Sequence, residues 1–509
     1  MSLWYQRNCR PAGARQLNGL ISPAGSPKRR SGLSEGGLEG DRGKMKRTVA
    51  LYPAPGMSHL ITMVELGKLI HLRLHLPVTV LIASPPFNLG DTTPYVKDVE
   101  SSDLGISFHY LPQPFDFSPQ DHNAQHHELL VFKFLNACSP HVKDALELIS
   151  KSSTILATVV DFFCIASVSV AAANLGLPVY VYLISPAGAL ASLLYFQEQH
   201  RQTDLSFRRL NEDLHIPGIP PLPSLDMPPP TLDREETYYC FLEVSSQMSR
   251  AHGIIVDTFD ALEPRALRAI RNGLCVPNGP TPPVHGIGPV ISAWKRAERD
   301  DQCLNWLDSQ PDCSVVFLCF GSLGRFSVDQ LGQIADGLER SGQRFLWVVR
   351  GPASGSGPAL VSEDPDPDAL LPQGFLERTR GKGLVVKSWA PQARVLSHGA
   401  VGGFVTHCGW TSVLESVCAG VPMVAWPLYA EQRINRVLLV KELRLAVVIQ
   451  EAEVERCVRL LVDSEEGAAL RERAAAARDA AATAMKEGGS SWASLARLGE
   501  EWESRASTK

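Results

Sequence analysis

The sequence predicts an α/β protein made of two doubly wound domains, each containing a mainly parallel β-sheet. Short runs of apolar and β-branched residues alternate with amphipathic helical patterns, which is typical of a parallel sheet covered by helices. The alternation stops in a stretch rich in Pro and Gly at 277–289 and restarts at residue 314. A chain of 509 residues is also long enough to form more than one domain.

The expected strands are short, apolar and bounded by turn residues. In the first domain they lie at 48–52, 78–83, 155–160, 179–183 and 253–256, with a helix at 63–72 after the first of them. In the second domain they lie at 314–320, 345–349, 384–386, 404–406, 423–425 and 446–449. The polar residues 294–300, together with 277–289, are expected to form the linker between the domains.

The two ends of the chain are expected to lie outside these domains. Residues 1–44 are rich in Gly, Ser, Pro and Arg and show no hydrophobic period, so we expect a disordered extension that precedes Met45. The domains then span 45–290 and 291–485. Residues 486–509 form a separate segment, with a helix at 492–505 that begins after the breaker Gly488 and Gly489.

Composition excludes several classes of function. The net charge of −5 and the pI near 6.3 give no basic patch for nucleic acid. Residues 162–196 carry no charge, but Pro178 and Pro186 divide them into helix, strand and helix, so we expect no stable membrane insertion. Eleven cysteines without a C-x-x-C pair favour reduced thiols in the cytoplasm. Cys408 has no partners at zinc spacing, so we expect no metal site.

The most informative stretch is 389–432, with the sequence WAPQARVLSHGAVGGFVTHCGWTSVLESVCAGVPMVAWPLYAEQ. A short buried strand ends at His407, and a helical pattern follows from Ser412. The free N–H groups and the positive macrodipole end of a helix N-terminus suit an anion such as a diphosphate. However, Ser412 and Glu415 also form an S-x-x-E capping box, which explains both residues without a ligand.

Polar residues follow three of the expected strands. His59 lies in the turn after the first strand, and Asp161 ends the strand at 155–160. Such side chains project into the crevice at the carboxyl edge of a sheet, and an imidazole that titrates near neutrality can accept a hydroxyl proton. Either residue could instead cap a helix. Gly321 and Ser322 follow the strand at 314–320, where a turn of small residues can approach a diphosphate.

The stretch 389–432 and the turn GMSHL around His59 resemble the signature of plant secondary-metabolite UDP-glycosyltransferases, which are family 1 enzymes such as flavonoid and phenolic O-glucosyltransferases. The resemblance extends from Met45 to the end of the chain. It implies a GT-B type fold, in which two Rossmann-like domains face a central cleft. The first domain would bind the acceptor and the second the UDP-sugar, and the helix in 486–509 would return to the first domain.

The resemblance also implies the reaction. The chain would be a monomer that transfers a hexose from UDP-glucose to a hydroxyl of a small lipophilic, phenolic or flavonoid acceptor, with inversion and without a metal or another cofactor. His59 would be the base, and Asp161 would hold its imidazole.

The roles of the other site residues follow from the same resemblance. Trp389 would stack on uracil, with Ala390 and Gln392 near the base and ribose. Ser412 would contact a phosphate, Glu415 the ribose hydroxyls, and Glu431 with Gln432 the sugar. The predicted UDP-sugar site as a whole contains Ser322, Trp389, Ala390, Gln392, His407, Trp410, Thr411, Ser412, Glu415, Glu431 and Gln432.

Two departures from the pattern of similar sequences leave an alternative open. Thr411 stands where those sequences carry Asn, and the connection after Gln450 is shorter than theirs. The alternative is therefore a UDP-sugar-binding protein with impaired or no catalysis. A dinucleotide oxidoreductase is disfavoured because no G-x-G-x-x-G fingerprint follows the first strand.

Overall fold

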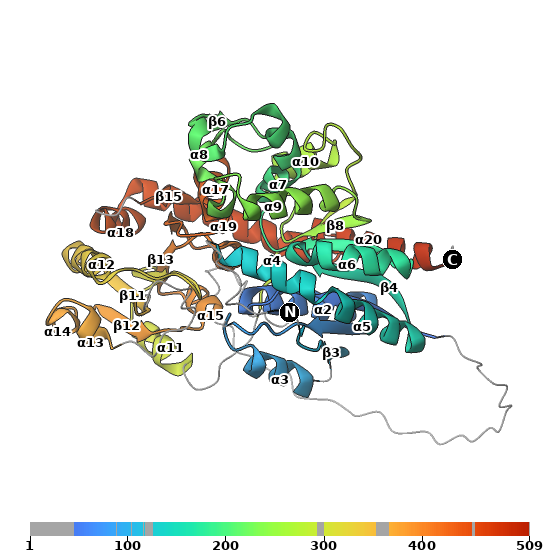
Figure 1. Cartoon of the computed structure of the whole chain (residues 1–509). Helices are drawn as coiled ribbons and strands as arrows, with labels where there is room; N and C mark the ends of the chain where they lie inside the picture. The colour runs from blue at the N-terminus through green and yellow to red at the C-terminus, as the bar shows by residue number, and fades with distance from the viewer. Residues whose placement is uncertain are drawn as a thin grey trace, which may run out of the picture.

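The computed structural model describes residues 45–507, except 88, 103, 116, 118–125, 293–299, 353–365 and 450–452. Two parallel sheets lie side by side, the first from the N-terminal half of the chain and the second from the C-terminal half (Figure 1). The predicted α/β class with two doubly wound sheets is confirmed. The domain boundaries at 290/291 and 485/486 stay predictions, and the expected extension 1–44 lies outside the described residues.

The first sheet has seven strands in the order β3-β2-β1-β4-β5-β8-β9, and all its neighbours are parallel. The strands are β1 Lys46–Tyr52, β2 Val78–Ile82, β3 Ile106–Tyr110, β4 Ser153–Asp161, β5 Val179–Leu183, β8 Gly253–Val256 and β9 Val284–Gly286. In β1, Val49 and Leu51 belong to one hydrophobic cluster, whereas Ala50 and Tyr52 belong to another. Both faces of the sheet are therefore covered, as in other parallel sheets.

Two strands of this sheet are absent from the sequence prediction. The strand β3 is only partly buried, so its apolar pattern is weak. The strand β9 lies inside the stretch 277–289, which was predicted to be linker; that part of the prediction is wrong. Three residues suffice here because they pair in parallel with β8 at the edge of the sheet. Prolines on either side of a short edge strand hide it from a pattern search.

The second sheet has six parallel strands in the order β12-β11-β10-β13-β14-β15. The strands are β10 Val315–Cys319, β11 Arg344–Val349, β12 Gly383–Lys387, β13 Val401–Thr406, β14 Met423–Ala425 and β15 Ala446–Val448. All six predicted strands of the second domain are confirmed, with ends that differ by a few residues. A separate antiparallel pair joins β6 Asp213–Leu214 to β7 Leu222–Pro223.

Helices cover both sheets (Figure 1). With the first sheet lie α2 Met57–Leu74, α3 Thr93–Ser101, α4 His127–Ala137, α5 Ser139–Ser152, η2 Phe162–Cys164, α6 Ile165–Asn174, α7 Ala187–Gln202, α8 Phe207–Leu210, η3 Ser224–Asp226, η4 Pro229–Thr231, α9 Glu236–Met248 and α10 Pro264–Arg271. From the later part of the chain come α11 Asp300–Asp308, α12 Val328–Ser341, α13 Pro367–Leu370, α14 Phe375–Arg378, α15 Gln392–Leu396, α16 Trp410–Ala419, α17 Gln432–Val437, the π-helical η5 Leu438–Glu442, α18 Val454–Asp463, α19 Glu465–Met485 and α20 Ser490–Ser507.

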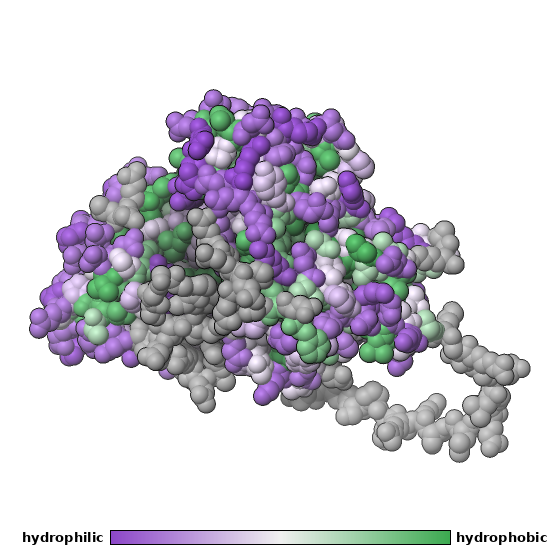
Figure 2. All heavy atoms as spheres, in the orientation of Figure 1, coloured by the Kyte–Doolittle hydropathy of each residue, from purple (hydrophilic) through white to green (hydrophobic). Residues whose placement is uncertain are grey.

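The uncharged stretch 162–196 folds as helix, strand and helix, which confirms the prediction made from its prolines. It contains η2, α6, β5 and the start of α7. In the described part of the chain, no helix has both the length and the apolar character that a bilayer span requires. On the face shown in Figure 2, hydrophobic residues form small separate groups among hydrophilic ones.

The helix α20 leaves the second half of the chain and packs on the first sheet (Figure 1). Trp502 is fully buried, and its ring meets the ring of Tyr180 edge-on at 5.7 Å. The Tyr180 hydroxyl donates a hydrogen bond to Glu501 Oε1 at 2.8 Å. A Cβ atom on Gly499 would lie 2.9 Å from Leu74 Cδ2, so the absence of a side chain lets α20 approach α2.

The helix α18 follows the short connection at Gln450, and residues 450–452 lie outside the described residues. On one side of that gap β15 pairs with β14, and on the other α18 packs on α12. A Cβ atom on Gly337 would lie 2.7 Å from Val454 Cβ, so the two helices are in close contact.

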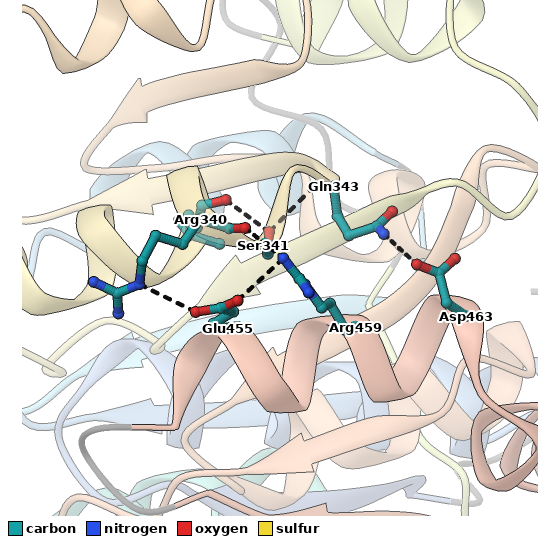
Figure 3. A network of polar contacts seen from close by, with 7 residues as sticks. Arg340, Ser341, Gln343, Glu455, Arg459 and Asp463 are labelled. Carbon is teal, nitrogen blue, oxygen red and sulfur yellow. Dashed lines mark hydrogen bonds and ion pairs between the residues drawn. The ribbon is translucent and has the colours of Figure 1, made fainter.

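Polar contacts add to this helix pair (Figure 3). Arg340 Nε and Glu455 Oε2 are 3.1 Å apart, and an Arg459 Nη atom donates to the Arg340 carbonyl at 2.7 Å. The helix α18, which follows the short connection, is therefore held against α12 by both apolar and polar contacts.

We expect Trp502→Ala to lower the free energy of unfolding by about 3–5 kcal/mol, because a fully buried tryptophan would leave a cavity between α20 and the first sheet. Denaturant titration followed by circular dichroism measures this change. The matched control is Trp492→Ala on the same helix. The Trp492 ring is only half-buried, with Arg73 Cζ 3.5 Å from its centroid, so its loss should cost less. Equal losses in the two variants would contradict the assigned packing.

Candidate functional site

A cavity of about 420 Å³ lies between the two sheets. Residues at the carboxyl ends of β1, β4 and β5 and on α4, α7 and α9 line it on the first side, and residues after β10, β13 and β14 line it on the other. Nine predicted site residues line this cavity, namely His59, Ser322, Gln392, His407, Trp410, Thr411, Ser412, Glu431 and Gln432. The other four predicted residues, Asp161, Trp389, Ala390 and Glu415, do not line it.

His59 and Asp161 form a hydrogen-bonded pair across the ends of two neighbouring strands. His59 Nδ1 lies 2.7 Å from Asp161 Oδ2, and the other carboxylate oxygen accepts a hydrogen bond from the backbone N–H of Phe163 at 3.0 Å. Asp161 therefore also caps η2, so the two alternatives considered for this residue hold together. His59 is the third residue of α2, whose N-cap is Gly56, and its ring bonds Asp161 rather than the helix backbone.

The surroundings set the basicity of His59. Burial lowers the pKa of the imidazole, but the charge and hydrogen bond of Asp161 outweigh burial, and the charge of Glu431 adds to them, so the net pKa is raised. Because Nδ1 faces Asp161, Nε2 is the atom left to face the cavity. The Phe163 ring meets the imidazole edge-on at 5.8 Å and limits its rotation. The pair is therefore a fixed imidazole with one free nitrogen at the cavity wall.

Opposite His59, the start of α16 points at the same cavity. The chain leaves β13, passes through Cys408 in the left-handed region at φ 66°, and enters α16 at Trp410 after the N-cap Gly409. No side chain caps this helix, so its first N–H groups remain available to a ligand. The prediction of a strand that runs into a helix N-terminus is confirmed, although the helix begins two residues before Ser412.

His407 lies between this helix start and the turn after β10. Burial, and then the positive charge of Arg350, lower the pKa of His407 to about 4, so the imidazole is neutral at physiological pH. A Cβ atom on Gly321 or Gly409 would lie 2.5 Å or 2.4 Å from His407 Nε2, and only glycine leaves room for the ring there. Nδ1 is buried without a hydrogen-bond partner among the described residues.

Arg350 is a residue that the sequence analysis missed. It follows β11, and its Nε donates to the Gly321 carbonyl at 2.9 Å. Its position at the carboxyl end of a parallel strand was the available signal, since the same rule selected His59 and Asp161. Tyr429 was also missed, although it lies within 389–432; its ring is 5.9 Å from that of His407.

Gln392 connects α15 to α16. Its Nε2 donates to Ser412 Oγ at 2.8 Å and to Glu415 Oε2 at 2.5 Å. Burial raises the pKa of Glu415 to about 7, and the hydrogen bond from Gln392 opposes this rise. The capping-box alternative is wrong here, because Ser412 occupies the third helical position and Gly409 is the N-cap. Instead, both side chains accept hydrogen bonds from the Gln392 side-chain amide.

Glu431 and Gln432 begin α17 at the cavity wall. Glu431 Oε1 accepts hydrogen bonds from Ser185 Oγ at 3.0 Å and from Asn435 Nδ2 at 3.2 Å, so it links the two halves of the molecule. Gln432 Oε1 accepts from the backbone N–H groups of Leu428 and Tyr429 at 2.9 Å and 3.0 Å. The side-chain oxygen of Gln432 is thus already hydrogen-bonded, and the side-chain NH₂ group is the part that can donate to a ligand.

Three predicted residues have side chains in other roles. The Trp410 indole N–H donates to the Asp257 carbonyl at 2.6 Å, and the ring is buried. The backbone of Trp410, rather than its ring, is therefore the part that can contact a ligand in the cavity. Ala390 is buried in the second core, and Trp389 lies half-buried beside it. Both lie next to α15, which carries Gln392.

The part of the cavity on the first-sheet side is mostly apolar. Aromatic rings from η2, α7 and α9 line it together with aliphatic residues, namely Phe162, Phe163, Phe196, Phe241, Leu183, Ile184 and Met227. Such walls suit a flat, lipophilic molecule, and a few polar groups at the wall fix its orientation. Among the described residues, no group of three or more His, Cys, Asp or Glu side chains could hold a metal ion.

Comparison with known proteins gives the same picture along the chain. Residues 274–454 match the family "UDP-glucoronosyl and UDP-glucosyl transferase". The anthocyanidin 5,3-O-glucosyltransferase of a Rosa hybrid cultivar is 44% identical over 480 residues, which cover 90% of this chain and 99% of the relative. The phloretin 2'-O-glucosyltransferase of Pyrus communis is 42% identical over 479 residues, covering 89% and 98%.

Solved structures are similar over the same length. Phytolacca americana UGT2, complexed with UDP-2fluoro-glucose and pterostilbene, has a TM-score of 0.80 and 34% identity, covering 90% of this chain and 100% of that one. Medicago truncatula UGT71G1, complexed with UDP-glucose, has a TM-score of 0.77 and 32% identity, covering 90% and 98%. Together with the two parallel sheets, these matches confirm the predicted GT-B type fold.

We expect Asp161→Asn to lower the pKa of His59, because the substitution removes the negative charge that outweighs burial. Titration of the imidazole resonances by NMR measures the change. His407 belongs to the other sheet and serves as an internal reference whose titration should not move. A His59 midpoint that stays where it is in the wild type would show that the 2.7 Å contact does not control the imidazole.

Proposed function

The chain belongs to the plant UDP-glycosyltransferases, and from this premise we propose that it transfers glucose from UDP-glucose to a phenolic hydroxyl. One observation carries the proposal. The fixed imidazole of His59 and the uncapped start of α16 face one cavity from opposite sheets. A base on one side and an anion site on the other are what a transfer from a nucleotide sugar to a hydroxyl requires.

On the second-sheet side, we propose that the diphosphate lies between the start of α16 and the turn at Gly321 and Ser322. The free N–H groups of the helix, its positive end and the neutral imidazole of His407 offer hydrogen-bond donors there. The hydroxyl of Thr411 would still donate toward a phosphate in place of the Asn of similar sequences.

The remaining roles taken from the family resemblance stay part of the proposal. Trp389 would stack on uracil, with Ala390 and Gln392 near the base and ribose, while Ser412 would contact a phosphate and Glu415 the ribose hydroxyls. Glu431 and the NH₂ group of Gln432 would bind the sugar, since both line the cavity.

For the acceptor, we propose a small lipophilic phenol of the flavonoid type. The aromatic and aliphatic walls between α4, α7 and α9 support this class, because they favour flat apolar molecules. The relatives from Rosa and Pyrus are named for glucosylation of anthocyanidins and phloretin, which are such molecules.

In the proposed reaction, His59 Nε2 accepts the proton of the acceptor hydroxyl while its oxygen forms a bond to the anomeric carbon. The bond from that carbon to the diphosphate oxygen breaks, and UDP leaves with the electron pair. Asp161 stabilises the imidazolium that results. A single displacement places acceptor and leaving group on opposite faces of the sugar, so the configuration inverts.

The proposed leaving-group stabilisation comes from the protein, and the transfer is therefore proposed to be metal-independent. The N–H groups of α16 and the donors around His407 face the position where negative charge develops. We also keep as proposals that the protein acts as a monomer and in the cytoplasm.

The alternative of a UDP-sugar-binding protein without catalysis has less support. It was suggested by the short connection after Gln450, yet the sheet and helices on both sides of that connection are in place. The 2.7 Å pair of His59 and Asp161 would also have no purpose in simple binding of a UDP-sugar on the opposite sheet.

We expect His59→Ala to reduce kcat for a phenolic acceptor by about 10² to 10⁴, which is the usual contribution of a general base. The affinity for UDP should not change, because the proposed donor residues belong to the other sheet. UDP release measures transfer, and calorimetry measures binding. His75→Ala, at the opposite end of α2, is the control and should keep wild-type turnover. Wild-type rates in the His59 variant would remove this residue from the mechanism.

For the donor, we expect UDP-glucose to be used about tenfold better than UDP-galactose, as one well-placed hydrogen bond from Gln432 would provide. Relative kcat/KM values for the two donors test this. Gln432→Glu keeps the oxygen that accepts from Leu428 and Tyr429 but removes the NH₂ donor, so it should weaken the preference without disturbing the loop. Equal or better use of UDP-galactose by the wild type would refute the role of Gln432.

A further inference from the structure

Arg350 is a half-buried cation next to the proposed diphosphate site. It follows β11, and burial lowers its own pKa. Among the described residues, no carboxylate forms an ion pair with it. A guanidinium held in such a place costs free energy unless an anion compensates it. Its location therefore points to a ligand charge rather than to a contribution to stability.

The contacts of Arg350 lead directly to the site. Its Nε donates to the Gly321 carbonyl at 2.9 Å, and this bond fixes a turn in which Gly321 has a φ of 74°. The same glycine lies against His407, since a Cβ atom there would be 2.5 Å from Nε2. Arg350 thus contacts the Gly321 turn from the side away from the cavity, and both Gly321 and His407 line the cavity.

Several charged and titratable groups surround the His407 imidazole and set its charge. Arg350 acts on it from the end of β11, with Arg325 beside Arg350, and its positive charge adds to burial in lowering the pKa of the imidazole. From the loop after β14, Tyr429 faces the ring, and the negative charge of Glu431 acts on Tyr429. A neutral imidazole donates a hydrogen bond but brings no charge to a diphosphate.

We propose that Arg350 is a positioning residue for the UDP-sugar, which holds the Gly321 turn against His407 and supplies from behind it the positive charge that the imidazole lacks. This proposal rests on the proposed function. An arginine stays protonated over the whole physiological range, so its attraction for the diphosphate does not depend on pH. A protonated histidine in its place would lose the charge as the pH rises.

The test is the affinity for UDP-glucose, measured by calorimetry without acceptor between pH 5 and 8. The diphosphate of UDP-glucose is esterified on both phosphates and does not titrate in this range. Arg350→Gln should weaken binding by about fivefold to thirtyfold at pH 8, the effect expected for one partly screened charge nearby. Binding should recover in part toward pH 5, because loss of the cation removes one of the two causes, after burial, that lower the pKa of His407.

Two further variants separate charge from geometry. Arg350→Lys keeps the charge and loses the planar Nε contact with Gly321, so it should bind more tightly than the Gln variant and show no recovery at low pH. Arg344→Gln is the matched control: this arginine begins the same strand and donates to Gln310 Oε1 at 3.1 Å, far from the site. It should leave both the affinity and its pH dependence as in the wild type.

The outcomes are distinct. An Arg350→Gln variant that binds UDP-glucose as the wild type does, with the same pH dependence, would overturn this proposal alone. Weaker binding without recovery at low pH, together with an NMR titration of His407 that has not moved, would overturn the role of the charge. If the wild type itself fails to bind UDP-glucose, both the proposed function and this proposal fall.

Discussion

The hydrogen bond from the Trp410 indole to the Asp257 carbonyl joins the start of α16 to the end of β8, and the geometry of the whole site depends on such contacts between the sheets. The Ser185 hydroxyl and Glu431 form a second link, and Arg436 pairs with Asp226 as a third. The first sheet positions only the base, and the second positions only the anion site. A base on one sheet is useful only at the right distance from an anion site on the other, so relative placement is the property that these buried contacts maintain.

The cavity uses two imidazoles with opposite electrostatics. His59 gains basicity from Asp161 despite its burial, whereas His407 loses basicity through burial and Arg350. The protein therefore obtains a proton acceptor and a neutral hydrogen-bond donor from the same type of side chain. The difference comes from the charged residue next to each imidazole, and each of these charged residues lies at the carboxyl end of a strand. Asp161 ends β4, and Arg350 follows β11, so the placement of charges at carboxyl edges distinguishes the two sites.

Much of the fold could be predicted from the sequence, because buried parallel strands are continuous apolar runs that stand out between helices. The strands β5, β8 and β14 match their predicted limits. The strands β3 and β9 were missed, since an edge strand needs neither full burial nor length. In the site, residues that end a strand could be found by position. Contacts that depend on tertiary packing could not be predicted. Examples are the hydrogen bonds from the Gln392 amide to Ser412 and Glu415, and the bond that the side-chain oxygen of Gln432 accepts from the backbone of Tyr429.

The position of α20 has a consequence for the order of events during synthesis. The strands of the first sheet leave the ribosome early, but Leu495, Leu498 and Trp502 complete the hydrophobic cluster on one of its faces. Domains often fold in the order in which they are made. Here α2 and α3 cover part of that face early, but the part under α20 stays uncovered while the whole second sheet is translated, until residues 490–507 emerge. Apolar surface that is exposed during this interval favours aggregation, so the late position of α20 in the chain carries a cost during folding.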